Sequence, residues 1–183
     1  AGIFTRDMVH DDDYSTAFFS ESERFFHNRM NGVLAQYNGK RNSYVEFVCD
    51  WEGMYSTLSR EKFRILLAGR HYLDTFYYGF NYSMFHYAGQ QGAPIENVVD
   101  LQLLNPCVGV RFNAFFDFDI KLGALLTAQR DRSFGHSWEK PCMGEFAFRI
   151  SRWGLSLDER LYVGDNIHPF FYGHELEDGT PLP

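Results

Sequence analysis

Residues 116–132, FDFDIKLGALLTAQRDR, alternate between apolar and polar positions. The apolar set is Phe118, Ile120, Leu122, Ala124, Leu126 and Ala128. The polar set includes Asp119, Lys121, Gly123, Thr127, Gln129 and Asp131, and Leu125 is out of place. Successive side chains of a β-strand point to opposite faces, so this pattern predicts a strand with one apolar and one polar face.

The same two-residue period recurs along the chain and predicts eight strands. They cover residues 30–38, 43–52, 62–72, 75–87, 106–115, 116–132, 142–151 and 153–164. A short helix is expected only at 20–26, SESERFF, where Ser20 and Glu23 have the spacing of a capping box. The predicted fold class is all-β.

The connections between these strands alternate between short and long. The short connections are 37–42, 72–75, 115–118 and 151–153, and the long ones are 53–61, 88–105, 131–141 and the residues after 164. This order predicts an antiparallel up-and-down meander with its tight turns at one end and its long loops at the other. That is the plan of a transmembrane β-barrel of the outer-membrane type.

Alternation alone does not say whether the apolar face meets a core or lipid, because a soluble sandwich or barrel also alternates. Three features favour lipid. Several strands run about 11–13 residues, whereas globular strands average about 5–6 and membrane strands need about 9–11. Large aromatic residues gather near the turns, and the polar face mixes glycines with isolated charges. We therefore expect Val45, Phe47, Leu122 and Leu126 to face lipid, and Glu46, Asp50, Lys121 and Gln129 to face a lumen.

Composition divides the chain of 183 residues into three parts and argues against some functions. Aromatic residues make up 18%, and the formal charge of −7 is concentrated at the ends. Residues 1–30 and 165–183 are expected to be acidic, solvated segments, and 31–164 to hold the barrel strands. No basic stripe indicates nucleic-acid binding. No apolar run reaches the roughly 20 residues of a transmembrane helix, and the three scattered cysteines suggest neither a zinc nor a redox motif.

Charged residues on the predicted polar face are the candidate functional residues. They are Glu46, Asp50, Arg64, Arg70, Arg111, Asp119, Lys121, Glu145, Arg149, Asp158 and Arg160. A selective pore would favour one sign, whereas this set is nearly balanced. The balance indicates internal ion pairs and hence a narrow or plugged interior, although a selectivity role for these charges stays an alternative.

Charge also predicts the register of the hairpin across 53–61. A symmetric loop there places Asp50 opposite Arg64 and Glu52 opposite Lys62. Opposite charges facing each other on neighbouring strands contribute roughly 0.2–1 kcal/mol.

The hairpin across 151–153 has two registers that keep each face intact. One sets Glu145 against Asp158, and the other sets Glu145 against Arg160 and Arg149 against Ser156. Because like charges directly opposite each other are destabilising, the second register is expected.

The sequence gives weaker support for a catalytic or a metal site than for internal ion pairs. The histidines His71, His86, His136, His168 and His174, with Ser83, Ser133 and Ser137, could form a hydrolase site, above all in SFGHSW at 133–138. No acid can be assigned by spacing, so no catalytic residue is predicted. The stretches HDDD at 10–13 and GDNIH at 164–168 could offer oxygen ligands to a cation, but such clusters more often form turns. No cofactor or metal is expected.

Three stretches carry a resemblance to a known class. LYVGDNIHPFFYG at 161–173, and REKFRILLAGR at 60–70 followed by FYYGFNYSMFHYAG, look like segments of uncharacterised bacterial outer-membrane β-barrel proteins. The body at 31–164 resembles such proteins in texture and order. The resemblance implies an outer-membrane location, the lipid bilayer as partner, no nucleic acid, and a porin-like or scaffold role with a small solute as conceivable cargo. It transfers no active site.

The resemblance has two departures, since no signal peptide opens the chain and no strand ending in an aromatic residue closes it. We therefore expect the chain to be part of a larger barrel and to contain only some of its strands. The alternatives are an outer-membrane barrel hydrolase acting on lipid and a soluble β-barrel ligand-binding protein.

Overall fold

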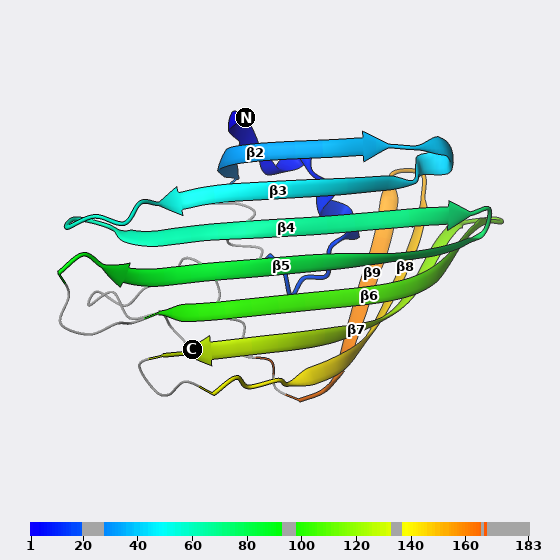
Figure 1. Cartoon of the computed structure of the whole chain (residues 1–183). Helices are drawn as coiled ribbons and strands as arrows, with labels where there is room; N and C mark the ends of the chain where they lie inside the picture. The colour runs from blue at the N-terminus through cyan, green and yellow to red at the C-terminus, as the bar shows by residue number, and fades with distance from the viewer. Residues whose placement is uncertain (20–27, 93–97, 133–136, 166, 168–183) are drawn as a thin grey trace.

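A computed structural model describes all residues except 20–27, 93–97, 133–136, 166 and 168–183. The described chain folds into one antiparallel sheet of nine strands in sequence order (Figure 1). The strands are β1 Gly2–Thr5, β2 Arg29–Asn38, β3 Tyr44–Gly53, β4 Arg60–Leu73, β5 Phe76–Gln90, β6 Val99–Asn113, β7 Asp117–Asp131, β8 Cys142–Arg152 and β9 Leu155–Gly164. The all-β antiparallel meander predicted from the sequence is thus present.

The sheet bends strongly around a hollow. In Figure 1, β8 and β9 lie behind the plane of β2–β7, and the N-terminal residues lie within the bend. Over the described residues, β1 pairs with β2 alone and β9 with β8 alone, so the sheet is open rather than a closed barrel.

The structure differs from the sequence-based prediction chiefly in one added strand and two longer ones. β1 was not predicted, because its four residues are too few to display a period. The loop expected at 88–105 is wrong for residues 99–105, which belong to β6, while β5 runs on to Gln90. Alternation continues through these positions, but it was obscured where polar residues enter the apolar face. Long connections nevertheless gather at one end of the sheet and tight turns at the other (Figure 1).

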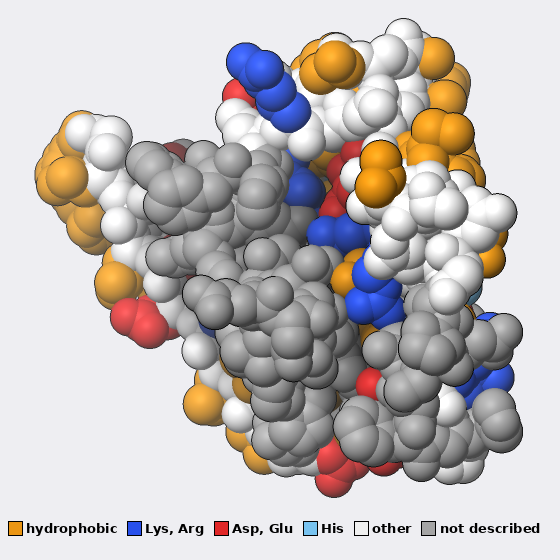
Figure 2. All heavy atoms as spheres, turned by 90° about the vertical axis from the view of Figure 1, so that its left-hand side faces the viewer, with side chains coloured by type: hydrophobic (Ala, Val, Ile, Leu, Met, Phe, Trp, Pro, Cys, Tyr) orange, Lys and Arg blue, Asp and Glu red, His pale blue; other side chains and the backbone are white. Residues whose placement is uncertain are grey.

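The two faces of the sheet differ sharply in chemistry. The concave face carries the charged set of β3–β9, whereas exposed side chains such as Val45, Phe80, Leu122 and Leu161 cover the convex face. Figure 2, seen from the long-loop end, shows Arg and Lys side chains inside the hollow and hydrophobic side chains along parts of the periphery. Most of the charged strand residues therefore point inward, and most of the exposed apolar surface points outward.

The concave face also holds an apolar cluster, and the N-terminal segment supplies a third of it. Tyr14, Phe18 and Phe19 are at most 1% exposed and pack against Leu66 and Leu125, the two leucines that interrupt the alternation. The expectation that this whole segment is solvated is therefore wrong for Tyr14, Phe18 and Phe19, whose rings need apolar partners and find them inside the sheet.

Within the described residues, three short 3₁₀ helices accompany the strands: η1 Arg6–Met8, η2 Asp11–Asp13 and η3 Lys40–Asn42. The helix predicted at 20–26 lies outside the described residues. In the described part of the chain, no helix is long and apolar enough to span a membrane.

The register of β3 and β4 was predicted in part. Asp50 lies opposite Arg64, as expected. Glu52 lies in a bulge, so the ladder pairs Lys62 with Gly53 instead. The ion pair still forms, with Lys62 Nζ 2.8 Å from Glu52 Oε2.

Both registers considered for β8 and β9 are wrong. Glu145 lies opposite Tyr162, and Arg149 lies opposite Asp158. The turn consists of Trp153 and Gly154, which both have positive φ, 54° and 78°. This two-residue turn matches the twist of a hairpin and moves the pairing two residues beyond the expected register, so each residue keeps its face.

Candidate functional site: a charged network inside the sheet

All eleven candidate charges lie on the concave face, as their positions in the strand registers show. Seven of them surround one open cavity of about 40 Å³ near the tight-turn end. They are Arg70, Arg111, Asp119, Lys121, Arg149, Asp158 and Arg160. Asp12 and Asp13 of the N-terminal segment line the same cavity. Glu46, Asp50, Arg64 and Glu145 belong to neighbouring parts of the hollow.

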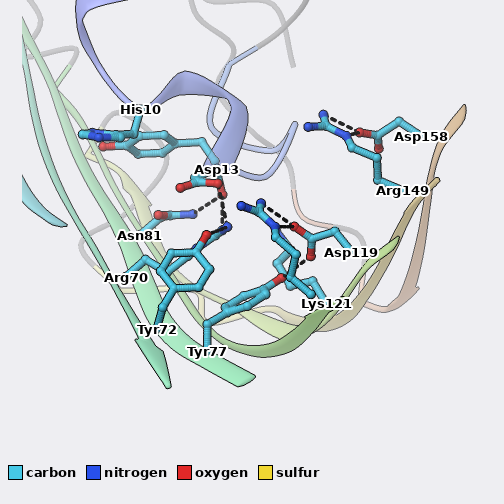
Figure 3. A network of polar contacts seen from close by, with 12 residues as sticks. His10, Asp13, Arg70, Tyr72, Tyr77, Asn81, Asp119, Lys121, Arg149 and Asp158 are labelled. Atoms are coloured by element: carbon cyan, nitrogen blue, oxygen red, sulfur yellow. Dashed lines mark hydrogen bonds and ion pairs between the residues drawn. The ribbon is translucent and has the colours of Figure 1, made fainter. Parts of the chain in front are cut away.

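Asp13 anchors the N-terminal segment to β4 and β5 (Figure 3). Its Oδ1 lies 2.6 Å from Nη1 of Arg70, and its backbone oxygen accepts a hydrogen bond from Nδ2 of Asn81 at 3.1 Å. The Arg70 guanidinium also lies over the ring of Tyr77, 4.6 Å from the ring centroid. Both charges are largely withdrawn from solvent, so each depends on the other.

A second pair joins β6 and β7 beside the first. Arg111 approaches Asp119 with Nη2 and Nε at 2.6 and 3.0 Å, a two-pronged contact on Oδ2. The Tyr77 hydroxyl donates to the other oxygen, Oδ1, at 2.7 Å. A Cβ on Gly109 would lie 2.2 Å from Tyr77 Cζ. Glycine at position 109 therefore allows Tyr77 to lie across the sheet and reach Asp119.

The third pair belongs to β8 and β9. Arg149 Nη2 lies 2.6 Å from Asp158 Oδ2 (Figure 3). Arg160 Nε lies 3.5 Å from the other oxygen of Asp158. Arg160 also donates from Nη1 to the backbone oxygen of Tyr14 at 2.9 Å. The N-terminal segment thus spans the hollow from β4 to β9.

Glu145 on β8 has a side chain with no exposed surface. Lys121 Nζ lies 3.2 Å from Oε2, and Asn105 donates to the same oxygen at 3.1 Å. Tyr162 donates to Oε1 at 3.3 Å. A Cβ on Gly123 would approach Asn105 Nδ2 to 2.9 Å, so this glycine leaves room for the cluster.

Glu46 on β3 binds two side chains of the N-terminal segment, those of His10 and Tyr14. Its Oε2 lies 2.8 Å from Nδ1 of His10, and its Oε1 accepts from the Tyr14 hydroxyl at 2.9 Å. Gln36 donates to Oε2 at 2.9 Å. The His10 ring stacks on Tyr44, with centroids 3.7 Å apart. Sequence periodicity indicated Glu46, but it could not indicate partners from a segment without a period.

Asp50 and Arg64 lie toward the long-loop end and are both buried. Asp50 Oδ1 accepts a hydrogen bond from the backbone N–H of Asn31 at 2.7 Å. The Arg64 guanidinium lies 5.7 Å from the ring of Phe19 and 5.7 Å from that of Phe85. This arginine is therefore set among aromatic rings.

The positions of the described histidines and acids give little support to a catalytic or a metal site. His71 and His86 lie on the convex face, on strands β4 and β5, and Asp13 is engaged by Arg70. His136, His168, His174 and Ser133 lie outside the described residues. Within the described ranges, no group of three or more His, Cys, Asp and Glu side chains could hold a metal ion.

An apolar groove of about 310 Å³ lies on the convex face at the tight-turn end. Gly69 forms part of its lining, with Tyr37, Val45, Tyr78 and Phe80 around it. The groove therefore presents aromatic and aliphatic surface on the side opposite to the charges.

The concave network consists of paired charges on the inner face of the bent sheet. The N-terminal segment contacts this network from β4 to β9. Among the described residues, this arrangement fixes the segment within the hollow and leaves the cavity of about 40 Å³ between the charges. No protein-family model, curated protein or solved structure matches this chain.

Proposed function

We propose that this chain forms part of the wall of a bacterial outer-membrane β-barrel and acts as a membrane scaffold whose interior is filled by its own N-terminal segment. The observation that carries the proposal is the sense of the alternation. A soluble barrel or sandwich turns its apolar face inward, whereas here large apolar side chains lie on the convex surface and charges lie within. Leu122, Leu157 and Leu161 are each more than half exposed. A surface of this kind suits lipid better than water.

The convex apolar side chains form a band across the strands, and the length of this band along each strand supports the same proposal. On β7 the outward residues are apolar from Phe118 to Ala128, and Arg130 ends the run. On β5 they are uncharged from Phe76 to Met84, and His86 follows. These runs match the roughly 9–11 residues with which a tilted strand crosses a bilayer.

Aromatic residues lie at both borders of the band. At the long-loop end, Trp51 stacks on Phe63, with ring centroids 5.4 Å apart. At the tight-turn end, Phe112 stacks on Phe118 at 4.9 Å, and Trp153 meets Phe115 edge to face. Aromatic girdles at both water–lipid borders are typical of outer-membrane barrels.

The two edge strands of the described sheet, β1 and β9, would need partners in a membrane. Lipid cannot satisfy the unpaired backbone N–H and C=O groups of a sheet edge. In a bilayer, the outer edges of β1 and β9 would therefore need further strands as partners.

Oxygen accessibility of spin labels tests the proposal. Single cysteines would be placed at successive positions from 119 to 128 after replacement of Cys49, Cys107 and Cys142 by serine, and the chain would be reconstituted in vesicles. We expect labels at even positions to be accessible to oxygen dissolved in lipid, and labels at odd positions to be protected. High accessibility of the even positions to a water-soluble nickel reagent, in place of oxygen dissolved in lipid, would favour the soluble ligand-binding alternative.

A porin-like role is the second candidate, and the open cavity favours it. Arg70, Arg111 and Arg149 face Asp119 and Asp158 there, so a small polar solute would meet both signs of charge. Single-channel conductance in planar bilayers distinguishes the two roles. A sealed scaffold gives no steady current, whereas a pore conducts without any substitution.

A further inference from the structure

A row of charged residues crosses the convex face at the long-loop end. His86, Asp100 and Arg130 are direct cross-strand partners on β5, β6 and β7. Asp100 Oδ1 lies 2.8 Å from His86 Nδ1, and Asp100 Oδ2 accepts from both Arg130 and Arg132, the latter at 3.1 Å. One carboxylate therefore holds two guanidinium groups, and the row has a surplus of positive charge.

Trp138 completes this cationic row. The Arg130 guanidinium lies over its ring, 4.4 Å from a ring centroid. A guanidinium held at its edge by a carboxylate and at its face by an aromatic ring has a fixed orientation. The side chains of Arg130 and Arg132 remain 20% and 34% exposed. Each guanidinium has five N–H donors, so the exposed donors that Asp100 does not use can meet an external acceptor.

The row marks the place where the apolar band ends. The next residues of the same face toward the tight turns are Met84, Gln102 and Ala128, followed by Tyr82, Leu104 and Leu126. The cationic row therefore lies at one border of the band, and the level of the lipid headgroups would coincide with it.

We infer that the cationic row binds the phosphate of an anionic lipid in the leaflet at the long-loop end. This inference rests on the proposed membrane location. Guanidinium groups pair with phosphate through two parallel hydrogen bonds, and basic sites at the membrane border bind anionic headgroups. The Trp138 ring suits the same interfacial level. Free phosphate has the same chemistry, but the site's position beside the apolar band favours a phosphate attached to acyl chains.

Quenching of Trp138 fluorescence by brominated lipid tests the inference. Replacement of Trp51 and Trp153 by phenylalanine leaves Trp138 as the single tryptophan. The chain would be reconstituted in phosphatidylcholine vesicles that contain a minor share of phosphatidylglycerol, with bromine on one lipid or the other. We expect phosphatidylglycerol to quench Trp138 well beyond its share of the lipid.

Arginine variants make the test specific. Arg132→Gln leaves the contact between Arg130 and Trp138 in place, and we expect it to lower the preference for phosphatidylglycerol about fivefold. Arg130→Gln together with Arg132→Gln should abolish the preference. Lys40→Gln together with Arg41→Gln removes the same charge at the opposite end, in η3, and should leave the preference unchanged.

The outcomes separate this inference from the proposed function. Quenching by both lipids in proportion to their amounts would overturn the inference alone. Quenching by neither lipid would overturn the membrane location as well. Loss of the preference on addition of excess inorganic phosphate would assign the site to free phosphate and overturn the lipid assignment.

Discussion

Asp13 and Arg70 form an ion pair 2.6 Å long across 57 positions of the chain. It joins η2 of the N-terminal segment to the concave face of the sheet, where the Arg70 side chain is 5% exposed. The pair therefore fixes the N-terminal segment to the concave face of the sheet.

Arg70→Gln should destabilise the protein by about 3 kcal/mol, because it leaves the Asp13 carboxylate without its cation in a largely dry site. The free energy of unfolding in urea, measured on protein refolded into vesicles, checks this. Arg41→Gln is the matched control, since the Arg41–Asp74 pair is exposed and should be worth under about 1 kcal/mol. Equal losses in the two variants would contradict a structural role for the Asp13–Arg70 pair.

Leu122→Arg should cost about 2–4 kcal/mol if the convex face meets lipid, because a charge near the middle of the bilayer loses its hydration. Lys121→Arg on the neighbouring concave position keeps the charge beside Glu145 and should be tolerated much better. The yield of folded protein in vesicles and the free energy of unfolding are the measurements. Equal tolerance of arginine at both positions would refute the assignment of the faces.

Gly109→Ala should cost about 1–3 kcal/mol, because the new methyl group would overlap Tyr77 and displace the hydroxyl that donates to Asp119. Gly89→Ala, also within a strand, meets no atom within 4 Å and serves as the control. Thermal unfolding of the three proteins gives the comparison. A loss at position 89 as large as that at position 109 would show that contact with Tyr77 is not the cause.

Tyr14→Ala should open the hollow, because it removes a fully buried ring and one of the donors to Glu46. We expect more frequent current steps in planar bilayers and faster proteolysis before residue 20. Tyr37→Ala removes an exposed ring of the same size on β2 and should change neither. Identical currents in all three proteins would mean that the N-terminal segment does not seal the interior.

Periodicity was sufficient to predict the faces of the strands, since each side chain of a strand has one of two directions. Asp50 opposite Arg64 followed from a symmetric loop. The pairing of Glu145 did not follow from charge, because the left-handed backbone of Trp153 and Gly154 sets the turn, and no charge rule contains that geometry.

The partners of the candidate charges were less accessible to prediction. His10, Asp13 and Tyr14 reach Glu46 and Arg70 from a segment with no repeating pattern. One hint was the pair of leucines at positions 66 and 125, apolar residues on a charged face. Both pack against the N-terminal segment, so a break in the alternation marked the place that the segment covers.

Tyr162 of β9 hydrogen-bonds to Thr16, 146 positions earlier, at 2.6 Å, and Arg160 reaches Tyr14 across the same separation. Contacts between such distant residues form late in folding, because a long chain must first be brought together. The N-terminal residues can complete their contacts only after the ninth strand has joined the sheet. The segment that leaves the ribosome before any other part of this sheet therefore reaches its final position last, and during assembly the hollow stays open to water.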